Sequence, residues 1–434
     1  MLTKFLIGIT LTIFSIGTYF IWFDKRNIFN HISIGFCFVA YVIPAFVINY
    51  TEYFKPDVIS LYVWISIIGC LFYMVGMFLG YKWKALIFVD TILQFRFLNL
   101  LSNNSKAIEK IGRLSSLIYI VGVVGVIVSF MLMGFVPLFA SDPYMARFFK
   151  GQYQQPYERV AFLYRTSRQL VELLMPLKVL ELFIKFNFKS IFLILMGIVA
   201  IAVSLNRGPI LYGTLIGVSI FVALKKRNAP FWIFILVIFS SYIIGSSMFY
   251  IIGLLFPDSI FGLGVGQYNI FEAIASGAPD IKDQINFLSA FLYSGSHYTY
   301  GLTIFGGLIP FNFPWNPAVY TLTILNDTND ISEIVSGGLR LPVSIWGYVS
   351  FGWIGVAILP FFSGFLTGYI VKKVKKIING LSENTNGYIL FFFLYFMYTN
   401  IGAVFMSFFT LSIYSLPAFA IYYLYVKKVK LALN

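Results

Sequence analysis

Long apolar stretches recur along the whole chain and are separated by short polar ones. A stretch of about 17 to 25 apolar residues is long enough, as an α-helix, to cross a hydrocarbon layer roughly 30 Å thick. The pattern therefore predicts an all-α, polytopic membrane protein with about eleven spans, in a range of about 10 to 12. We expect these spans at residues 3–22, 31–50, 58–80, 115–135, 159–184, 190–206, 209–224, 230–255, 342–371, 386–405 and 407–426.

Basic residues fall in every second gap between the expected spans. Because Lys and Arg concentrate in cytoplasmic loops, these gaps mark the cytoplasmic side. They hold Lys25 with Arg26, the segment 82–113, Lys185 with Lys189, Lys225 to Arg227, Lys372 to Lys376, and Lys427 to Lys430. The alternation predicts that the first span enters from the outside. Its apolar run is too long for the core of a signal peptide.

The longest gap, residues 257–341, falls on the outer side and divides the chain into three parts. Residues 1–256 hold about eight of the expected spans, and residues 342–434 hold about three. A segment of such length without structure of its own is uncommon, so it is a candidate functional element. Its part 284–310 is apolar but rich in Ser, Gly and Tyr, which favours a re-entrant or interfacial element over a further span.

On the cytoplasmic side, the segment 82–113 mixes Lys and Arg with Phe, Leu and Ile. This composition favours a basic amphipathic element that lies against anionic lipid. A solvated linker is the alternative interpretation, and the sequence does not decide between the two.

Composition supports the same class of protein. Hydrophobic residues make up 59% of the 434 residues and charged residues 11%, whereas about a quarter of a soluble domain is charged. The cytoplasmic loops account for the formal charge of +14, so no nucleic acid partner is expected. Cys37 and Cys70 lie in apolar runs, which predicts buried thiols rather than a disulfide or a metal pair. The chain shows no nucleotide-binding or metal-binding motif, and we expect neither a cofactor nor a metal.

Arg207 lies between two very apolar runs, in the sequence SLNRGPIL of residues 204–211. The expected spans on either side are short, so the turn between them should lie somewhat below the outer surface. Gly208 and Pro209 suit the start of the next helix, whose free N–H groups and positive dipole end would lie beside the guanidinium. The arrangement predicts that Arg207 binds paired phosphate oxygens. A structural role, with the side chain reaching lipid headgroups, is the alternative.

The fifth expected span is the least apolar one. Arg165, Arg168 and Glu172 fall at i, i+3 and i+7, so they share a helix face, and Arg168 and Glu172 have the spacing of an ion pair. Ionisable residues inside a span usually face a bundle interior or a wet cavity. Arg165 and Arg168 are therefore candidate phosphate ligands. The alternative is a structural Arg168–Glu172 pair, with Arg165 directed to the outer headgroups.

The outer segment carries residues suited to sugar binding. His297 lies beside Tyr298 and Tyr300, which combines rings for stacking with a titratable group. His297, Glu272, Asp280 and Asp283 are candidate bases that would accept a proton from an acceptor hydroxyl, and the sequence does not choose among them. A lone histidine is more often a structural residue, and this remains the alternative.

Arg340 and several tryptophans complete the outer candidates. Arg340 follows two glycines at the start of the ninth expected span and is a second cation on the outer face. Trp315, Trp346 and Trp353 are candidate platforms for sugar rings. They are equally well explained as belt residues at the membrane interface.

Three stretches together resemble bacterial oligosaccharide repeat-unit polymerases, the Wzy-type polymerases of O-antigen and capsule. The first is SLNRGPIL at 204–211. The second is YTYGLTIFGGLIPFNFPWNP at 298–317, and the third is LPVSIWGYVSFGWIGVAILPFFSGFLTGYI at 341–370. With the topology, the resemblance covers most of the chain. It implies an all-helical, metal-independent, inverting glycosyltransferase in the bacterial cytoplasmic (inner) membrane.

The resemblance also implies a substrate and partners. The substrate would be an undecaprenyl-pyrophosphate-linked oligosaccharide, joined to others on the outer leaflet, and a chain-length regulator and a flippase of the same pathway would be partners. Arg207 matches the residue that binds the pyrophosphate. Arg340 matches less well, because Gly352 does not follow it at the spacing found in some members. A flippase for lipid-linked oligosaccharides and an O-antigen ligase share the same physical features and remain alternatives.

Overall fold

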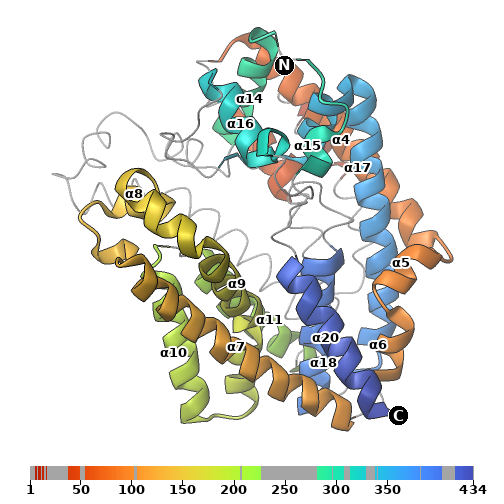
Figure 1. Cartoon of the computed structure of the whole chain (residues 1–434). Helices are drawn as coiled ribbons and strands as arrows, with labels where there is room; N and C mark the ends of the chain where they lie inside the picture. The colour runs from red at the N-terminus through yellow and green to blue at the C-terminus, as the bar shows by residue number, and fades with distance from the viewer. Residues whose placement is uncertain are drawn as a thin grey trace.

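A computed structural model describes residues 54–101, 105–205, 208–225, 281–295, 297–306, 313–328, 338–339, 341–381, 383–402 and 416–433, with parts of 5–48. Every regular element in these ranges is a helix (Figure 1). The longer ones are α4 (Pro56–Lys82), α7 (Ser105–Met133), α9 (Gln154–Ile184), α10 (Phe188–Ala202), α11 (Gly208–Lys225), α14 (Ile281–Tyr293), α16 (Pro317–Asn326), α17 (Val343–Ile378), α18 (Thr385–Phe396) and α20 (Leu416–Leu433). The shorter ones are η1 (Phe38–Val42), α3 (Ile43–Val47), α5 (Ile87–Ile92), α6 (Phe95–Leu101), η3 (Pro137–Phe139), α8 (Pro143–Phe148), η4 (Gly151–Tyr153), α15 (Leu302–Phe305), η7 (Phe313–Trp315) and η8 (Met397–Gly402).

Within the described ranges, three helices are long and apolar enough to cross a membrane, namely Pro56–Lys82, Ile108–Phe139 and Val343–Ile378. Two shorter apolar helices are Phe188–Ala202 and Ile216–Lys225. These helices support the expected class, a helical membrane protein. The expected span 230–255 lies wholly outside the described residues, and the spans 3–22, 31–50 and 407–426 are described only in part, so the total of about eleven stays a prediction.

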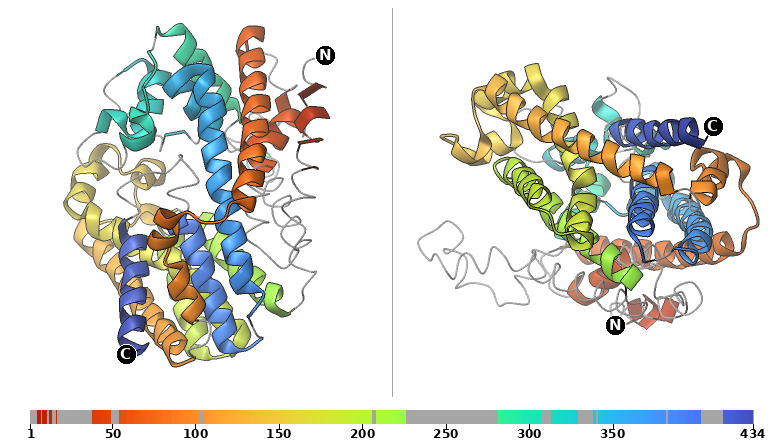
Figure 2. Two further views of the ribbon diagram at one scale, coloured as in Figure 1. Left: turned by 90° about the vertical axis from the view of Figure 1, so that its right-hand side faces the viewer. Right: turned by 90° about the horizontal axis from the view of Figure 1, so that it is seen from below.

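Helices α4 and α17 lie side by side and run in the same direction (Figure 2). Gly76 and Gly80 are one turn apart on α4, and Gly364 and Gly368 are one turn apart on α17. A Cβ added at Gly76 would overlap the carbonyl oxygen of Phe361, so the two backbones are in direct contact. Small residues at this spacing let helices approach closely, which is the main source of helix association in lipid.

Helices α7, α9 and α11 form a second group, in which α7 runs opposite to the other two. Gly122 and Gly125 of α7 face Leu170 and Ser167 of α9, respectively, so these two helices are antiparallel. Helix α11 runs in the same direction as α9 and contacts it through its own glycines. The relative directions agree with the alternation that the basic residues predict.

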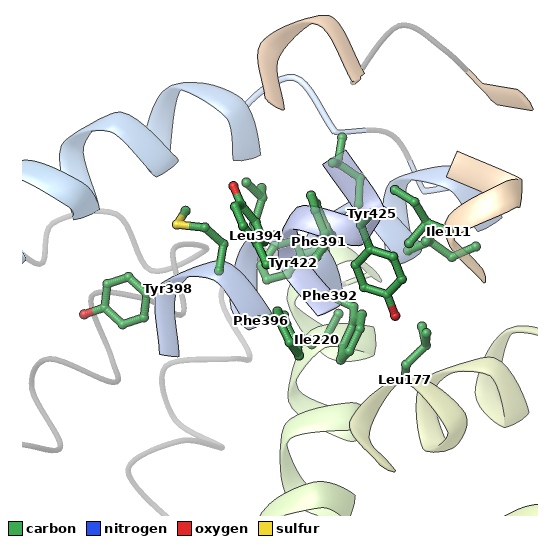
Figure 3. Packing of buried hydrophobic residues seen from close by; sticks show 14 of the residues in the cluster. Ile111, Leu177, Ile220, Phe391, Phe392, Leu394, Phe396, Tyr398, Tyr422 and Tyr425 are labelled. Atoms are coloured by element: carbon green, nitrogen blue, oxygen red, sulfur yellow. The ribbon is translucent and has the colours of Figure 1, made fainter. Parts of the chain in front are cut away.

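An aromatic core joins α18 and α20 to this second group (Figure 3). Phe393 of α18 stacks on Tyr422 of α20 with ring centroids 5.3 Å apart, and Phe221 of α11 stacks on Tyr388 with centroids 5.5 Å apart. The buried Tyr422 hydroxyl donates a hydrogen bond to the carbonyl oxygen of Leu93 at 2.6 Å. Each ring therefore buries a large apolar area, and the Tyr422 hydroxyl keeps a hydrogen-bond partner.

The cytoplasmic segment expected at 82–113 is largely helical. It contains α5 and α6, and α7 already begins at Ser105, well before the expected span at 115–135. Lys106, Lys110 and Arg113 therefore lie on the first turns of α7 rather than in a linker. Arg113 pairs with Glu109 one turn earlier at 2.6 Å, as expected for an exposed helix face.

The described part of the long outer segment packs where α4 and α17 begin (Figure 1). Tyr62 of α4 donates a buried hydrogen bond to Gln284 of α14 at 2.9 Å, and the ring of Phe287 contacts Trp346 of α17. Helix α14 has 13 residues, fewer than the roughly 20 that a span needs. Its length suits the re-entrant or interfacial element expected in 284–310, while residues 257–280 lie outside the described ranges.

The contact between α4 and α17 makes a direct prediction for Gly76. Gly76→Val places a side chain against the Phe361 carbonyl, so the helices must separate. We expect a loss of about 2 kcal/mol or more, the cost of overpacking a tight contact. Val75→Leu, on the exposed face of the same helix, is the control. Thermal unfolding in detergent should show a lower midpoint for the first variant alone, and equal midpoints would contradict the close backbone contact.

Candidate functional site

Arg165 and Arg168 lie on α9 beside a group of aromatic rings. Arg165 Nε donates a short hydrogen bond to the Tyr157 hydroxyl, and its guanidinium carbon lies 5.3 Å from the centroid of that ring. The Arg168 guanidinium lies 5.9 Å from the Tyr164 ring. Phe149 stacks on Tyr157 with centroids 3.8 Å apart. The rings hold both guanidinium groups by cation–π and hydrogen-bond contacts and so fix their positions.

The ion pair expected from spacing is present. Arg168 Nε lies 2.9 Å from Glu172 Oε1, and both side chains are half-buried. Removing one partner of such a pair leaves an uncompensated charge in a poorly solvated place. Much of the Arg168 charge is therefore neutralised by Glu172, whereas the hydrogen-bond partner of Arg165 Nε is a neutral phenol.

The turn after α10 lies at the same end of α9. Helix α10 ends at Ala202, and Leu205 has a φ of +58°, in the left-handed region that reverses the chain before α11. Val203 accepts a hydrogen bond from Leu138 N at 3.0 Å. Val203 also packs in the hydrophobic cluster that contains Tyr157 and Tyr164. Arg207 and Arg340 themselves lie outside the described residues.

Helix α17 corresponds to the expected span 342–371, and it is broken near its start. Phe351 and Gly352 have non-helical backbone angles, and Gly352 has φ +61° and ψ −145°. The backbones on either side of the break meet at Gly347 and Gly355, where a Cβ on either residue would overlap the other's carbonyl. The chain turns here because Gly352 adopts a positive φ, which glycine does at little steric cost.

Residues 297–300, from the segment 257–341, supply hydrogen bonds to the carbonyls at the break. Thr299 N donates to the carbonyl of Val349 and Tyr300 N donates to the carbonyl of Ser350, both at 3.0 Å. We call residues 297–300 the strap. Backbone carbonyls at membrane depth need such partners, so the strap and the broken helix stabilise each other.

The strap presents the predicted sugar-binding residues at the surface. His297, Tyr298 and Tyr300 have exposed side chains, and Tyr300 is 73% exposed. The Tyr298 ring meets that of Tyr348 edge-on, with centroids 6.3 Å apart. Tyr298 is thus held rigidly, while Tyr300 and His297 face outward. The structure brings these three residues together, in a different part of the fold from Arg165 and Arg168 (Figure 1).

The three candidate tryptophans differ in exposure and in their ring contacts. Trp315 is half-buried and stacks on Tyr320 with centroids 6.1 Å apart, and Trp353 is exposed. Trp346 is buried among the core rings, so it is neither a sugar platform nor an interfacial belt residue. Burial raises the pKa of Tyr320 to about 12, so its hydroxyl stays protonated at neutral pH.

A polar network on α9 was missed by the sequence reasoning. The buried Lys178 Nζ lies 2.6 Å from Glu181 Oε2 and donates to Ser116 Oγ of α7 at 2.5 Å. Nearby, Ser115 Oγ and the Tyr425 hydroxyl of α20 are 2.5 Å apart. The available signal was the i, i+3 spacing of a lysine and a glutamate inside an apolar helix. The network joins three helices at the end of α9 opposite to Arg165.

The structure also bears on metal binding and on the cysteines. In the part of the chain that the structure describes, no three His, Cys, Asp or Glu side chains gather as metal ligands would, and Cys70 is a buried free thiol. Cys37 lies outside that part. No family model, curated protein or solved structure matches the chain.

The break in α17 makes Gly352 testable. Gly352→Ala forces a Cβ into a backbone conformation that only glycine adopts readily and brings it about 3.0 Å from the Tyr298 hydroxyl. Such strain costs roughly 1–3 kcal/mol, so we expect a lower thermal midpoint and faster proteolysis at the strap. Gly380→Ala, which has ordinary space around it, is the control. Equal behaviour of both variants would argue against the break.

Proposed function

We propose that this protein polymerises undecaprenyl-pyrophosphate-linked oligosaccharide units on the outer leaflet of the bacterial cytoplasmic (inner) membrane. The resemblance of three stretches to Wzy-type polymerases suggests the activity. One structural observation supports it most directly. The turn that leads to Arg207 packs on the same aromatic cluster that holds Arg165 and Arg168. A group of cations at one place in a bundle suits a diphosphate.

The proposed reaction asks the protein for positioning and for charge neutralisation. The acceptor hydroxyl attacks the anomeric carbon of the donor, the bond from that carbon to the diphosphate oxygen breaks, and the lipid diphosphate leaves with the electron pair. Fixed guanidinium groups stabilise the charge that develops on the leaving oxygen. In this proposal Arg207 and Arg165 bind the diphosphate, and Glu172 holds Arg168 beside them.

The outer segment would bind the sugars. Tyr298, Tyr300 and Trp315 offer ring faces, and His297 is an exposed imidazole next to two of them. The role of His297 as the base stays a prediction, because a base must lie within hydrogen-bond reach of the hydroxyl that attacks beside the diphosphate, and the strap lies in a different part of the fold from Arg165 and Arg168. Arg340 would add a further cation on the outer face. Partners in this proposal are the bilayer, a chain-length regulator and a flippase of the same pathway.

Deleting the gene in its own host tests the proposal against a flippase and a ligase. A polymerase mutant should carry single repeat units at the surface and lack long chains. A flippase mutant would instead accumulate units that face the cytoplasm. A ligase mutant would keep long chains attached to the carrier lipid. The measurement is a joint analysis of surface glycan length and the lipid-linked pool, and either of the last two results would overturn the assignment.

Variants returned to the deletion strain test the cations. Arg207→Ala and Arg165→Ala should lower chain extension by about a hundredfold or more, as when one donor to a developing anion is removed. Arg207→Lys should also be poor, because a point charge does not replace the bidentate fork. Arg159→Ala, an exposed cation on the same helix as Arg165, is the control. Glycan length is measured at equal membrane abundance, and normal chains from Arg207→Ala would contradict the site.

A further inference from the structure

The exposed face of α4 continues beyond the end of the helix. Leu71, Val75, Leu79 and Trp83 are exposed and follow each other at intervals of four residues, so they form one stripe. After the helix ends, Ile87 and Phe88 of α5 are 82% and 69% exposed. Such an apolar surface on a protein in water would favour aggregation. On a spanning helix, the stripe is the face that contacts lipid.

Helix α5 is held firmly, so its exposed face has a fixed direction. The Asp90 carboxylate accepts hydrogen bonds from the Tyr369 hydroxyl at 2.5 Å and from Lys373 Nζ at 2.9 Å. The Tyr369 hydroxyl in turn accepts a hydrogen bond from Leu86 N at 2.8 Å. Val89 is buried on the opposite side of the same short helix. These contacts fix α5 against the C-terminal half of α17, where Figure 1 shows the two helices as neighbours.

Lysines surround the apolar residues at this place. Lys82 and Lys84 are exposed on either side of Trp83, and Lys372 Nζ donates a hydrogen bond to the Trp83 carbonyl at 2.9 Å. Asp90 is the acidic residue in 82–93, and its carboxylate is already engaged by Lys373 and Tyr369. The free charge on this surface is therefore positive.

We infer that the segment 82–92 is a binding surface for anionic phospholipid. Trp83, Ile87 and Phe88 enter the boundary between headgroups and acyl chains, where aromatic side chains are enriched in membrane proteins. Lys82 and Lys84 bind the lipid phosphates from the adjoining headgroup layer. Lipid is the occupant that fits, because the surface continues the lipid-facing stripe of α4 and its charge is complementary to an anionic headgroup.

Trp83 itself can report the contact. The full chain is placed in nanodiscs with a tryptophan-free scaffold, and the Trp83 signal is the fluorescence difference between the unmodified protein and Trp83→Phe. Brominated phospholipid should quench this signal, and iodide in the water should not. Brominated phosphatidylglycerol should be preferred over brominated phosphatidylcholine by roughly fivefold, as expected for lysines near an anionic surface.

Paired lysine variants separate the charge from the apolar contact. Lys82→Gln with Lys84→Gln should remove the preference for phosphatidylglycerol and leave quenching by both lipids intact. Lys150→Gln with Lys282→Gln, at distant sites, is the control and should keep the preference. Quenching of Trp83 by iodide alone would overturn the inference. So would equal quenching by the two lipids in the unmodified protein, or protection of Trp83 from both reagents, which would indicate a protein occupant.

Discussion

The backbone contact between α4 and α17 is the constraint on which the described structure depends most. Lipid offers no hydrophobic drive to bring two apolar helices together, so the gain must come from van der Waals contact at short range. Gly76, Gly80, Gly364 and Gly368 provide it by removing the side chains between the two backbones. The pair then holds α14 at one end, through Tyr62 and Gln284, and α5 at the other.

Several partly or fully buried lysines and arginines of this protein are paired with carboxylates. Arg168 is paired with Glu172 and Lys178 with Glu181, both within α9, and Lys373 is paired with Asp90. Each pair makes a cation tolerable in a poorly solvated place, while also reducing its attraction for a ligand. Arg165 Nε donates a hydrogen bond to the Tyr157 phenol, which orients its guanidinium.

Sequence patterns predicted the features that depend on periodicity and composition. The length of the apolar stretches predicted the helical membrane class. The alternation of basic residues predicted the relative directions of the described helices. The i, i+4 spacing predicted the Arg168–Glu172 pair. The break at Gly352 could not be predicted, because nothing in its local sequence sets it apart from the other glycines of α17. The burial of Trp346 depends likewise on contacts with Phe287, far away in the chain. The predicted roles of Arg207 and Arg340 stay predictions, because both residues lie outside the described ranges.

The break in α17 explains why the outer segment belongs structurally to the spanning helices. A broken helix exposes carbonyl groups that lipid cannot satisfy, and here Thr299 and Tyr300 satisfy those of Val349 and Ser350. Moving the strap away would leave these carbonyls without partners, at a cost of several kcal/mol per group. The strap is therefore held in place by the backbone itself. Tyr298 and His297 are consequently presented by an element that the broken helix keeps in a fixed place.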